Sequence, residues 1–287
     1  MTKPTLIVTG AGGFLGEAIV EAAGRDGTFR VLPVLSPRAG GIDLASEAAP
    51  DVFAHLEIGD ASAACLVHAA AVVEFDTPRA MLANAAMALH TALWARSMRI
   101  GFCVLVSSVS VLPFSDPAPS GRDPRSLYGV GKLSAEYAWE ALLPRDKVAV
   151  ARVSGVWGWQ RRPTLFWNRL LLAAARGASS GPSIRVQRRR SRRNYVSADD
   201  AARCLLGLAR HRSAGTVTIA GRDAVDLGTF VDCVRRLPGS RLAFEDADDG
   251  ASDETLYDAS ASVQRWLRSF PEALDAIWSG RPAWVDA

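Results

Sequence analysis

The stretch LIVTGAGGFLGEAIV, residues 6–20, constrains the fold more than any other part of the sequence. A short apolar run at Leu6–Thr9 is typical of a buried β-strand, and apolar residues recur at helical spacing over Gly16–Ala23. Glycines 10, 12, 13 and 16 lie between the strand and the helix. A strand that passes through a glycine-rich turn into a helix predicts the start of an α/β fold, with a turn whose backbone can approach an anion closely.

The alternation of strand and helix continues along the chain. Further strands are predicted at Phe29–Leu35, Ala64–Val72, Phe102–Val111 and Val148–Val156, and helices at Ala80–Met98 and Ser126–Leu143. This order predicts a Rossmann-like, doubly wound parallel sheet covered by helices on both faces. After Gly158 the regularity falls and the chain becomes rich in Arg and Trp. We therefore predict a Rossmann domain at 1–158 and a smaller, partly interleaved α/β region at 159–287, some segments of which return to the sheet.

The composition narrows the class of protein. A net charge of +3 over 287 residues carries no global signature of nucleic-acid binding. No apolar run reaches the roughly 18 residues of a membrane span, and the N-terminus does not resemble a signal peptide. The cysteines at 65, 103, 204 and 233 are widely separated in apolar or helical stretches, as expected for buried thiols. We expect a soluble cytoplasmic protein without nucleic-acid, membrane or metal partners.

The glycine turn predicts a nucleotide site. Its spacing is Gly10-x-x-Gly13-x-x-Gly16 rather than GxGxxG. It nevertheless follows a predicted strand and opens a predicted helix, the context in which such turns bind the pyrophosphate of a dinucleotide.

The segment SLYGVGKLSAE contains a candidate catalytic pair. Tyr128 and Lys132 lie four residues apart on a predicted helix and share one face. An ammonium near a phenol lowers the pKa of the phenol, which makes tyrosine a usable acid or base near neutral pH. The same spacing also occurs in ordinary exposed Tyr–Lys pairs. Hydroxyls at Ser107, Ser108 and Ser110 close a buried strand, where they either begin a loop or hold a substrate oxygen beside the tyrosine.

Taken together, these segments resemble the extended short-chain dehydrogenase/reductases, in the branch of NAD(P)-dependent sugar-nucleotide epimerases and dehydratases. The resemblance extends over nearly the whole chain. It rests on TGAGGFLG at 9–16, HAAA at 68–71, VSSVSV at 106–111, YGVGK at 128–132, RVSGVWG at 152–158 and RRNYVSADDAA at 192–202.

The resemblance implies roles for individual residues. Tyr128 would be the catalytic acid/base, Lys132 would lower its pKa and bind the nicotinamide ribose, and Ser108 would orient the substrate carbonyl or hydroxyl. Asn84 matches a family asparagine. The cofactor-binding residues implied are Gly10, Gly13, Phe14, Leu15, Gly16, Ser36, Arg38, Asp43, Leu44, His68, Ala69, Ala70 and Lys132. The candidate substrate-binding residues are Ser108, Ser110, Tyr128, Trp157 and Arg193, of which Trp157 is a departure from the family's pattern.

The end of the second strand bears on the choice of cofactor. An acidic residue there holds the ribose hydroxyls of NAD, whereas an arginine accommodates the 2′-phosphate of NADP. Here Ser36 takes the acidic position and Arg38 follows, which favours NADP, with NAD as the alternative. We place the adenine-contacting aspartate at Asp43, with Asp60 as its rival, because too little chain separates Asp60 from His68 to form a helix.

Two reactions of the family are disfavoured. Members that dehydrate sugars resemble one another in an Asp-Glu pair after the catalytic Ser/Thr, where this chain has Val109 and Ser110. The Cys/His pair of 3,5-epimerising members has no histidine counterpart in the stretch after Arg152. Reduction or oxidation at one carbon and 4-epimerisation remain. Epimerases keep NAD bound, whereas reductases exchange a phosphorylated cofactor, so Ser36 and Arg38 favour a reductase of a nucleotide-activated keto-sugar. The alternatives are an NDP-sugar 4-epimerase or an NADPH-dependent reductase of a small non-nucleotide carbonyl.

The segment IRVQRRRSRRNYVSADD contains arginines 185, 188, 189, 190, 192 and 193. Their guanidinium groups repel one another unless an anion lies nearby. The resemblance places Arg193 on the substrate diphosphate, and we expect four of the others to be solvated. Trp157 is either part of an aromatic wall for the substrate or a core residue. We expect Asp199 to cap the helix that follows it.

A homodimer is also implied by the resemblance. In the family, the tyrosine-bearing helix and the one before it pack against a partner subunit. Here these are Ser126–Leu143 and Ala80–Met98, both rich in Ala, Leu and Trp on more than one face. The same composition fits helices that pack entirely against their own sheet.

Overall fold

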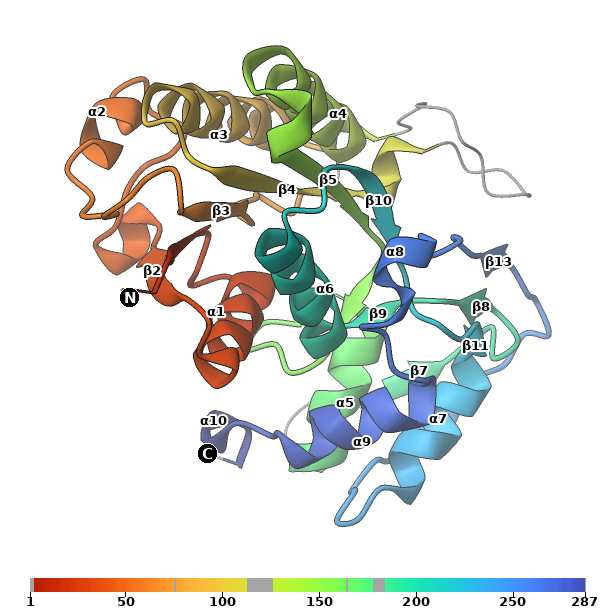
Figure 1. The fold of residues 1–287 in the computed structure, drawn as a ribbon. Helices are drawn as coiled ribbons and strands as arrows, with labels where there is room; N and C mark the ends of the chain where they lie inside the picture. Colours follow the sequence, from red (N-terminus) through yellow and green to blue (C-terminus); the bar gives the residue numbers. More distant parts are fainter. Residues whose placement is uncertain (1–2, 75, 113–125, 164, 178–183, 287) are drawn as a thin grey trace.

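A six-stranded parallel sheet lies at the centre of the protein (Figure 1). The computed structural model describes residues 3–74, 76–112, 126–163, 165–177 and 184–286. The strand order is β10-β5-β4-β3-β1-β2, and neighbouring strands pair in parallel. The strands are β1 (Thr5–Thr9), β2 (Arg30–Val34), β3 (Cys65–His68), β4 (Phe102–Ser108), β5 (Val148–Val153) and β10 (Gly215–Ile219). The Rossmann-like fold class predicted from the sequence is confirmed.

Helices cover both faces of this sheet (Figure 1). One face carries α1 (Phe14–Asp26) and α6 (Ala198–His211), and the other carries α2 (Ala49–Phe53), α3 (Pro78–Ser97) and α4 (Leu127–Leu142). Alternate strand residues supply the two cores: Leu6 and Val8 pack with α1 and α6, and Ile7 packs on the opposite side. A strand that is buried on both faces reads as a continuous apolar run, which is why the sequence located β1, β3, β4 and β5. The edge strand β10, which is partly exposed, was not predicted.

Three strands end earlier than predicted. The strand expected at Ala64–Val72 is limited to Cys65–His68. The strand expected to reach Val111 ends at Ser108, whose side chain accepts a hydrogen bond from Ser110 N and so starts the 3-10 turn Val109–Val111. The strand expected to reach Val156 stops at Val153, and the chain pairs again as β6 (Val156–Trp157) with β9 (Val196–Ser197).

The C-terminal region has a separate core. It is built mainly from α5 (Phe166–Arg176), α7 (Leu227–Arg236) and α9 (Phe270–Ser279), with α10 (Ala283–Asp286) against α5. Short strands complete it: β7 (Ile184–Val186) pairs with β12 (Phe244–Asp246), and β8 (Arg192–Arg193) pairs with β11 (Val225–Asp226) and β13 (Glu254–Thr255). Because β10 belongs to the main sheet and α6 packs on one face of it, the two regions interleave. The division at residue 158 stays a proposal, since Trp157, just before it, belongs to the C-terminal core.

The remaining short elements are the 3-10 turns Pro37–Ala39 and Arg145–Lys147 and the helix α8 (Ala261–Gln264). Cys65, Cys103 and Cys204 are buried, Cys233 is partly exposed, and all four are free thiols. Within the described ranges, no helix combines the length and the apolar character needed to cross a membrane.

Candidate active site

The glycine turn between β1 and α1 is closely packed against the end of β3. Gly10 has a φ of +71°, and a Cβ there would lie 2.6 Å from the backbone of Ala70. A Cβ on Gly16 would lie 2.0 Å from the carbonyl oxygen of Gly10, while Gly13 N donates to that same oxygen. Side chains at 10 or 16 would therefore force the turn open. The backbone of Ala69 and Ala70 lines the turn.

The start of α1 is arranged to receive an anion. Gly13 is the N-cap residue and, among the described residues, no side chain caps the helix. Its first backbone N–H groups are available to a ligand, and they carry the positive end of the helix dipole. Phe14 and Leu15 form the first turn and are partly exposed.

The segment after β2 folds back beside the turn. Gly41 N donates to Ser36 O, and Ile42 N donates to Leu35 O, so that Asp43 comes to the carboxyl end of the sheet. Ser36, Arg38 and Asp43 are exposed there. The backbone oxygen of Leu44, which is buried, lies 3.0 Å from His90 Nδ1.

Asp60 lies at the other end of the sheet. It accepts hydrogen bonds from Ser62 N and Oγ in the turn that precedes β3, and Gly101 N donates to Ala61 O just before β4. Ligands bind at the carboxyl ends of strands in open α/β sheets. The geometry therefore favours Asp43 over its rival.

His68 ends β3 with its side chain turned into the core. The ring is 1% exposed, and Nδ1 lies 2.8 Å from Thr9 Oγ1. Burial lowers the pKa of His68 to about 3, and nearby Lys132 acts in the same direction. The imidazole is neutral at physiological pH, and because the ring is enclosed in the core, any cofactor contact from His68 goes through its backbone.

The structure brings Ser108, Tyr128 and Lys132 together. Lys132 Nζ lies 5.9 Å from the centroid of the Tyr128 ring and donates to the Val106 carbonyl at 3.0 Å. The Tyr128 and Ser108 side chains are hydrogen-bonded, and Ser108 Oγ lies 3.1 Å from Ser110 Oγ. These groups meet where β4 ends, at the same edge of the sheet as the glycine turn.

Asn84 on α3 holds the chain that enters this edge. Its side chain accepts from Val72 N at 2.8 Å and donates to Val72 O at 3.0 Å, which fixes the segment after β3.

The pKa of Tyr128 differs from the value expected from the sequence. We expected Lys132 to lower the pKa of Tyr128, but burial raises the pKa of Tyr128 to about 12, and the Ser108 hydrogen bond only partly opposes this. Burial also lowers the pKa of Lys132 to about 8, against the attraction of Glu136. In this structure the desolvation of the phenol outweighs any effect of the ammonium, which is bound to a carbonyl.

Sequence reasoning missed a buried ion pair beside these residues. Glu136 on α4 binds Arg152 on β5 and Ser107 on β4. The signal was present, because Glu136 continues the spacing of four that links Tyr128 and Lys132.

Trp157 is a core residue, which corrects its assignment to the substrate site. It is 1% exposed, and its ring packs against Trp167, Phe230 and Phe270. Its Nε1 donates to Tyr195 O. A fully enclosed indole has no face to offer a sugar or a base.

Among the described residues, four of the arginines at 185–193 form ion pairs with carboxylates of the same chain. Acidic residues 43 to 62 positions later pair with them, including Asp253, whose Oδ2 lies 2.6 Å from Arg193 Nη2. The other pairs are Arg185–Glu245, Arg189–Asp232, Arg189–Asp246 and Arg192–Glu254. Arg193 is partly exposed, and a substrate diphosphate there would compete with Asp253.

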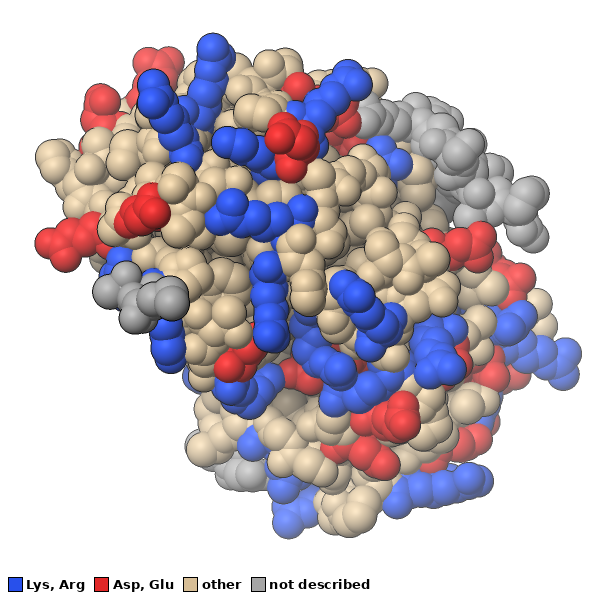
Figure 2. Space-filling model, in the orientation of Figure 1, with Lys and Arg blue, Asp and Glu red and all other residues tan. Residues whose placement is uncertain are grey.

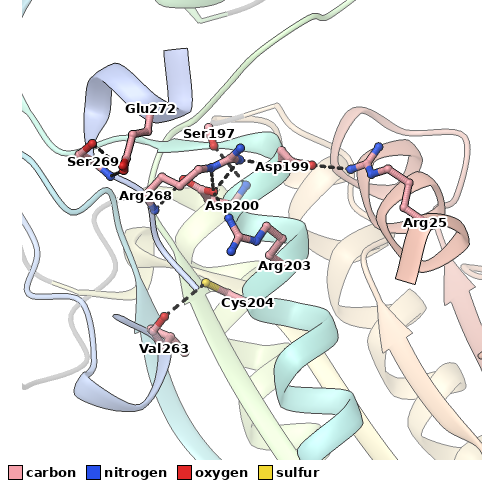
Figure 3. Close-up of polar contacts among 10 residues, drawn as sticks. All are labelled: Arg25, Ser197, Asp199, Asp200, Arg203, Cys204, Val263, Arg268, Ser269 and Glu272. Carbon is pink, nitrogen blue, oxygen red and sulfur yellow. Dashed lines mark hydrogen bonds and ion pairs between the residues drawn. The ribbon is translucent and has the colours of Figure 1, made fainter. Parts of the chain in front are cut away.

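Asp199 does not cap α6. Ser197 is the N-cap residue and accepts from Asp200 N, while Asp199 pairs with Arg25 and Arg268 (Figure 3). Basic side chains gather over α6 with acidic ones among them (Figure 2). The network borders a cavity of about 290 Å³ at the C-terminal half of α1, away from the glycine turn. Its arginines are paired with carboxylates, so it is a set of ion pairs and not a uniformly basic surface.

The fold and this edge of the sheet define a class: a Rossmann-type protein with a glycine turn, and with a tyrosine and a lysine on α4 beside the end of β4. The model of the NAD dependent epimerase/dehydratase family matches residues 6–220. The chain belongs to this family, which confirms the resemblance seen in the sequence. No curated protein matches the chain.

Solved structures of similar fold extend over almost the whole chain. The dTDP-4-dehydrorhamnose reductase from Bacillus anthracis str. Ames in complex with NADP is 16% identical with a TM-score of 0.78, covering 98% of this chain and 99% of that one. RMD from Pseudomonas aeruginosa complexed with NADPH is 19% identical with a TM-score of 0.78, covering 99% and 100%. UDP-glucuronic acid 4-epimerase from Bacillus cereus in complex with NAD is 16% identical with a TM-score of 0.75, covering 96% and 97%. At such identities the likeness establishes the fold.

Proposed function

We propose that the protein is an NADP-dependent oxidoreductase that reduces the keto group of a nucleotide-activated sugar. The observation that carries the proposal is the convergence of Ser108, Tyr128 and Lys132 at the edge of the sheet that also holds the glycine turn. Membership of the NAD dependent epimerase/dehydratase family supports it. The similar structures include reductases crystallised with NADP or NADPH.

The residues present fit a dinucleotide. The uncapped first turn of α1 and the side-chain-free turn at Gly10 and Gly16 suit a pyrophosphate. Ser36 and Arg38 would bind the 2′-phosphate, and Asp43 would contact the adenine side. When bound, the cofactor supplies the hydride.

The chain's own residues would then handle the proton. Tyr128 would donate its hydroxyl proton to the carbonyl oxygen, and Ser108 would orient that oxygen. With a pKa of about 12, Tyr128 carries its proton at neutral pH, which suits donation in the direction of reduction. Lys132, buried one helical turn further on, would bind the ribose and stabilise the phenolate that remains.

The substrate assignment rests on Arg193, which would take the diphosphate in exchange for Asp253. A 4-epimerase is the second candidate, because UDP-glucuronic acid 4-epimerase shares the fold. A small non-nucleotide carbonyl substrate would leave Arg193 without a role in binding.

Ligand-induced stabilisation separates these candidates. NADPH should raise the melting temperature more than NADH does, and Arg38→Ala should remove that difference. One of UDP, dTDP, GDP or CDP should add a further rise that Arg193→Gln removes. Arg192→Gln is the matched control, since Arg192 is an adjacent arginine that pairs with Glu254. A response to NADPH but to none of the nucleotides would contradict the sugar-nucleotide assignment. Loss of turnover in Tyr128→Phe tests the catalytic assignment.

A homodimer through α3 and α4 is part of the proposal. Leu82, Leu89 and Leu93 are exposed on α3, at spacings that place them along one side of the helix, and Tyr137 is 53% exposed on α4. Leu89→Glu combined with Leu93→Glu should convert a dimer to a monomer in light scattering. The free thiols fit the reducing cytoplasm, which we propose as the location.

A further inference from the structure

Three consecutive residues of β4 are bound by three residues of α4. The Val106 carbonyl accepts from Lys132 Nζ at 3.0 Å, and Ser107 Oγ donates to Glu136 Oε1 at 2.6 Å. The third contact is the hydrogen bond between the Ser108 and Tyr128 side chains. Because residues 128, 132 and 136 follow one another at single helical turns, one face of α4 is held in register with the end of β4.

Glu136 is the most buried member of this set. It is 0% exposed, and Arg152 contacts both of its oxygens: Nε lies 3.0 Å from Oε1, and Nη2 lies 2.8 Å from Oε2. Arg152 is itself fixed on β5, directly opposite Ser107 in the ladder. A carboxylate without water is costly unless it is paired, and this two-pronged contact with an added hydroxyl satisfies its charged form.

The groups around Lys132 leave Glu136 as the anion that acts on it. Lys132 is 4% exposed. Tyr128 on α4 is a neutral phenol at physiological pH, and His68 on β3 is a neutral imidazole. Arg152 on β5 is engaged by Glu136. Burial lowers the pKa of Lys132, and the attraction of Glu136 raises it.

We propose that Glu136 is a positioning residue: clamped by Arg152 and Ser107, it keeps the Lys132 ammonium charged and aligned with the end of β4. The part of this that concerns catalysis rests on the proposed reductase function. Lys132 stabilises the Tyr128 phenolate only while it carries its proton. Without the carboxylate, a buried ammonium at this place gives up that proton at lower pH.

The charge state of Lys132 can be measured without any substrate. The chain has three lysines, Lys3, Lys132 and Lys147, so ¹³C-lysine labelling gives an NMR spectrum with three resolvable Cε signals. In the parent protein, the Lys132 signal should titrate at lower pH than the two others. In Glu136→Gln its midpoint should fall further, by about one pH unit. Glu140→Gln, one turn further along α4, is the matched control and should leave the midpoint unchanged.

Glu136→Gln leaves the Arg152 charge buried without its partner, which destabilises the folded state, so a second variant is needed. The double variant Glu136→Gln/Arg152→Gln removes both charges, and its Lys132 midpoint should also lie below that of the parent. An unchanged midpoint in either folded variant would overturn the proposal.

Activity gives an independent readout. In Glu136→Gln the alkaline limb of the kcat profile for keto-sugar reduction should move to lower pH, with a smaller effect on KM for the substrate. If the parent reduces no nucleotide-activated keto-sugar, the proposed function fails while the NMR midpoint still decides the role of Glu136. A shifted midpoint with an unshifted kcat profile would refute the catalytic part.

Discussion

The close packing of the glycine turn can be tested by comparing two glycines of α1, one packed against the turn and one exposed. A Cβ on Gly16 would lie 2.0 Å from Gly10 O and 2.9 Å from the Cα of Ala11. Both neighbours are backbone atoms of the turn itself and cannot move aside alone. Gly24 is exposed on the same helix, and a Cβ there would meet nothing within 4 Å. The same substitution should therefore have opposite signs at the two positions.

The magnitudes follow from these contacts. Gly16→Ala should lower the free energy of unfolding by about 1–3 kcal/mol, the typical cost of overpacking, even though alanine favours helix. Gly24→Ala should raise it by about 0.5–1 kcal/mol, since only helix propensity changes. For a chain of this length the first change lowers the melting temperature by about 2–5 °C.

Urea unfolding monitored by circular dichroism measures the free energy of unfolding of both variants. Fluorescence titration with NADPH measures how tightly the glycine turn of each variant binds the cofactor. Gly16→Ala should also weaken NADPH binding, because the first turn of α1 must shift to relieve the contact. Gly24→Ala should bind NADPH as the parent does. If Gly16→Ala were as stable as Gly24→Ala, the close approach of helix and turn described above would be refuted.

Three further predictions concern the charge and packing of single residues. Burial lowers the pKa of Lys132 to about 8 in the folded chain, so Lys132 makes a contribution to stability that rises between about pH 8 and 10 by up to about 1.4 kcal/mol per unit. The buried thiols, whose pKa burial raises, act in the opposite direction in parent and variant alike. The free energy of unfolding of the parent minus that of Lys132→Met should therefore rise over this range in urea titrations. Arg188 has a φ of +51°, so Arg188→Gly should stabilise the fold by up to about 1 kcal/mol; a loss of stability would contradict this reasoning. Trp157→Ala should cost about 3–5 kcal/mol in unfolding experiments, and a specific rise in substrate KM at unchanged stability would return Trp157 to the binding site.

Much of the site could be predicted because its signals are local. The turn at Gly10–Gly16 lies within one strand–helix unit, and the spacing of Tyr128 and Lys132 is a property of one helix. The end of an apolar run marked the hydroxyls at 107, 108 and 110, and the resemblance to the family singled out Ser108. Glu136 was missed although it has the same spacing, because a single glutamate on a helix is ordinarily a solvated residue. Only its partner on β5, sixteen residues away, makes it part of the site.

The sequence by itself determined the strand–helix alternation up to Gly158, the glycine turn and the shared helix face of Tyr128 and Lys132, because each depends on neighbours within a few turns of chain. The tertiary structure alone decided that Trp157 is enclosed, that Arg193 meets Asp253, and that burial raises the pKa of Tyr128. These properties depend on which distant segments exclude water from a group or bring it an opposite charge. Hydrophobic periodicity contains no information about either.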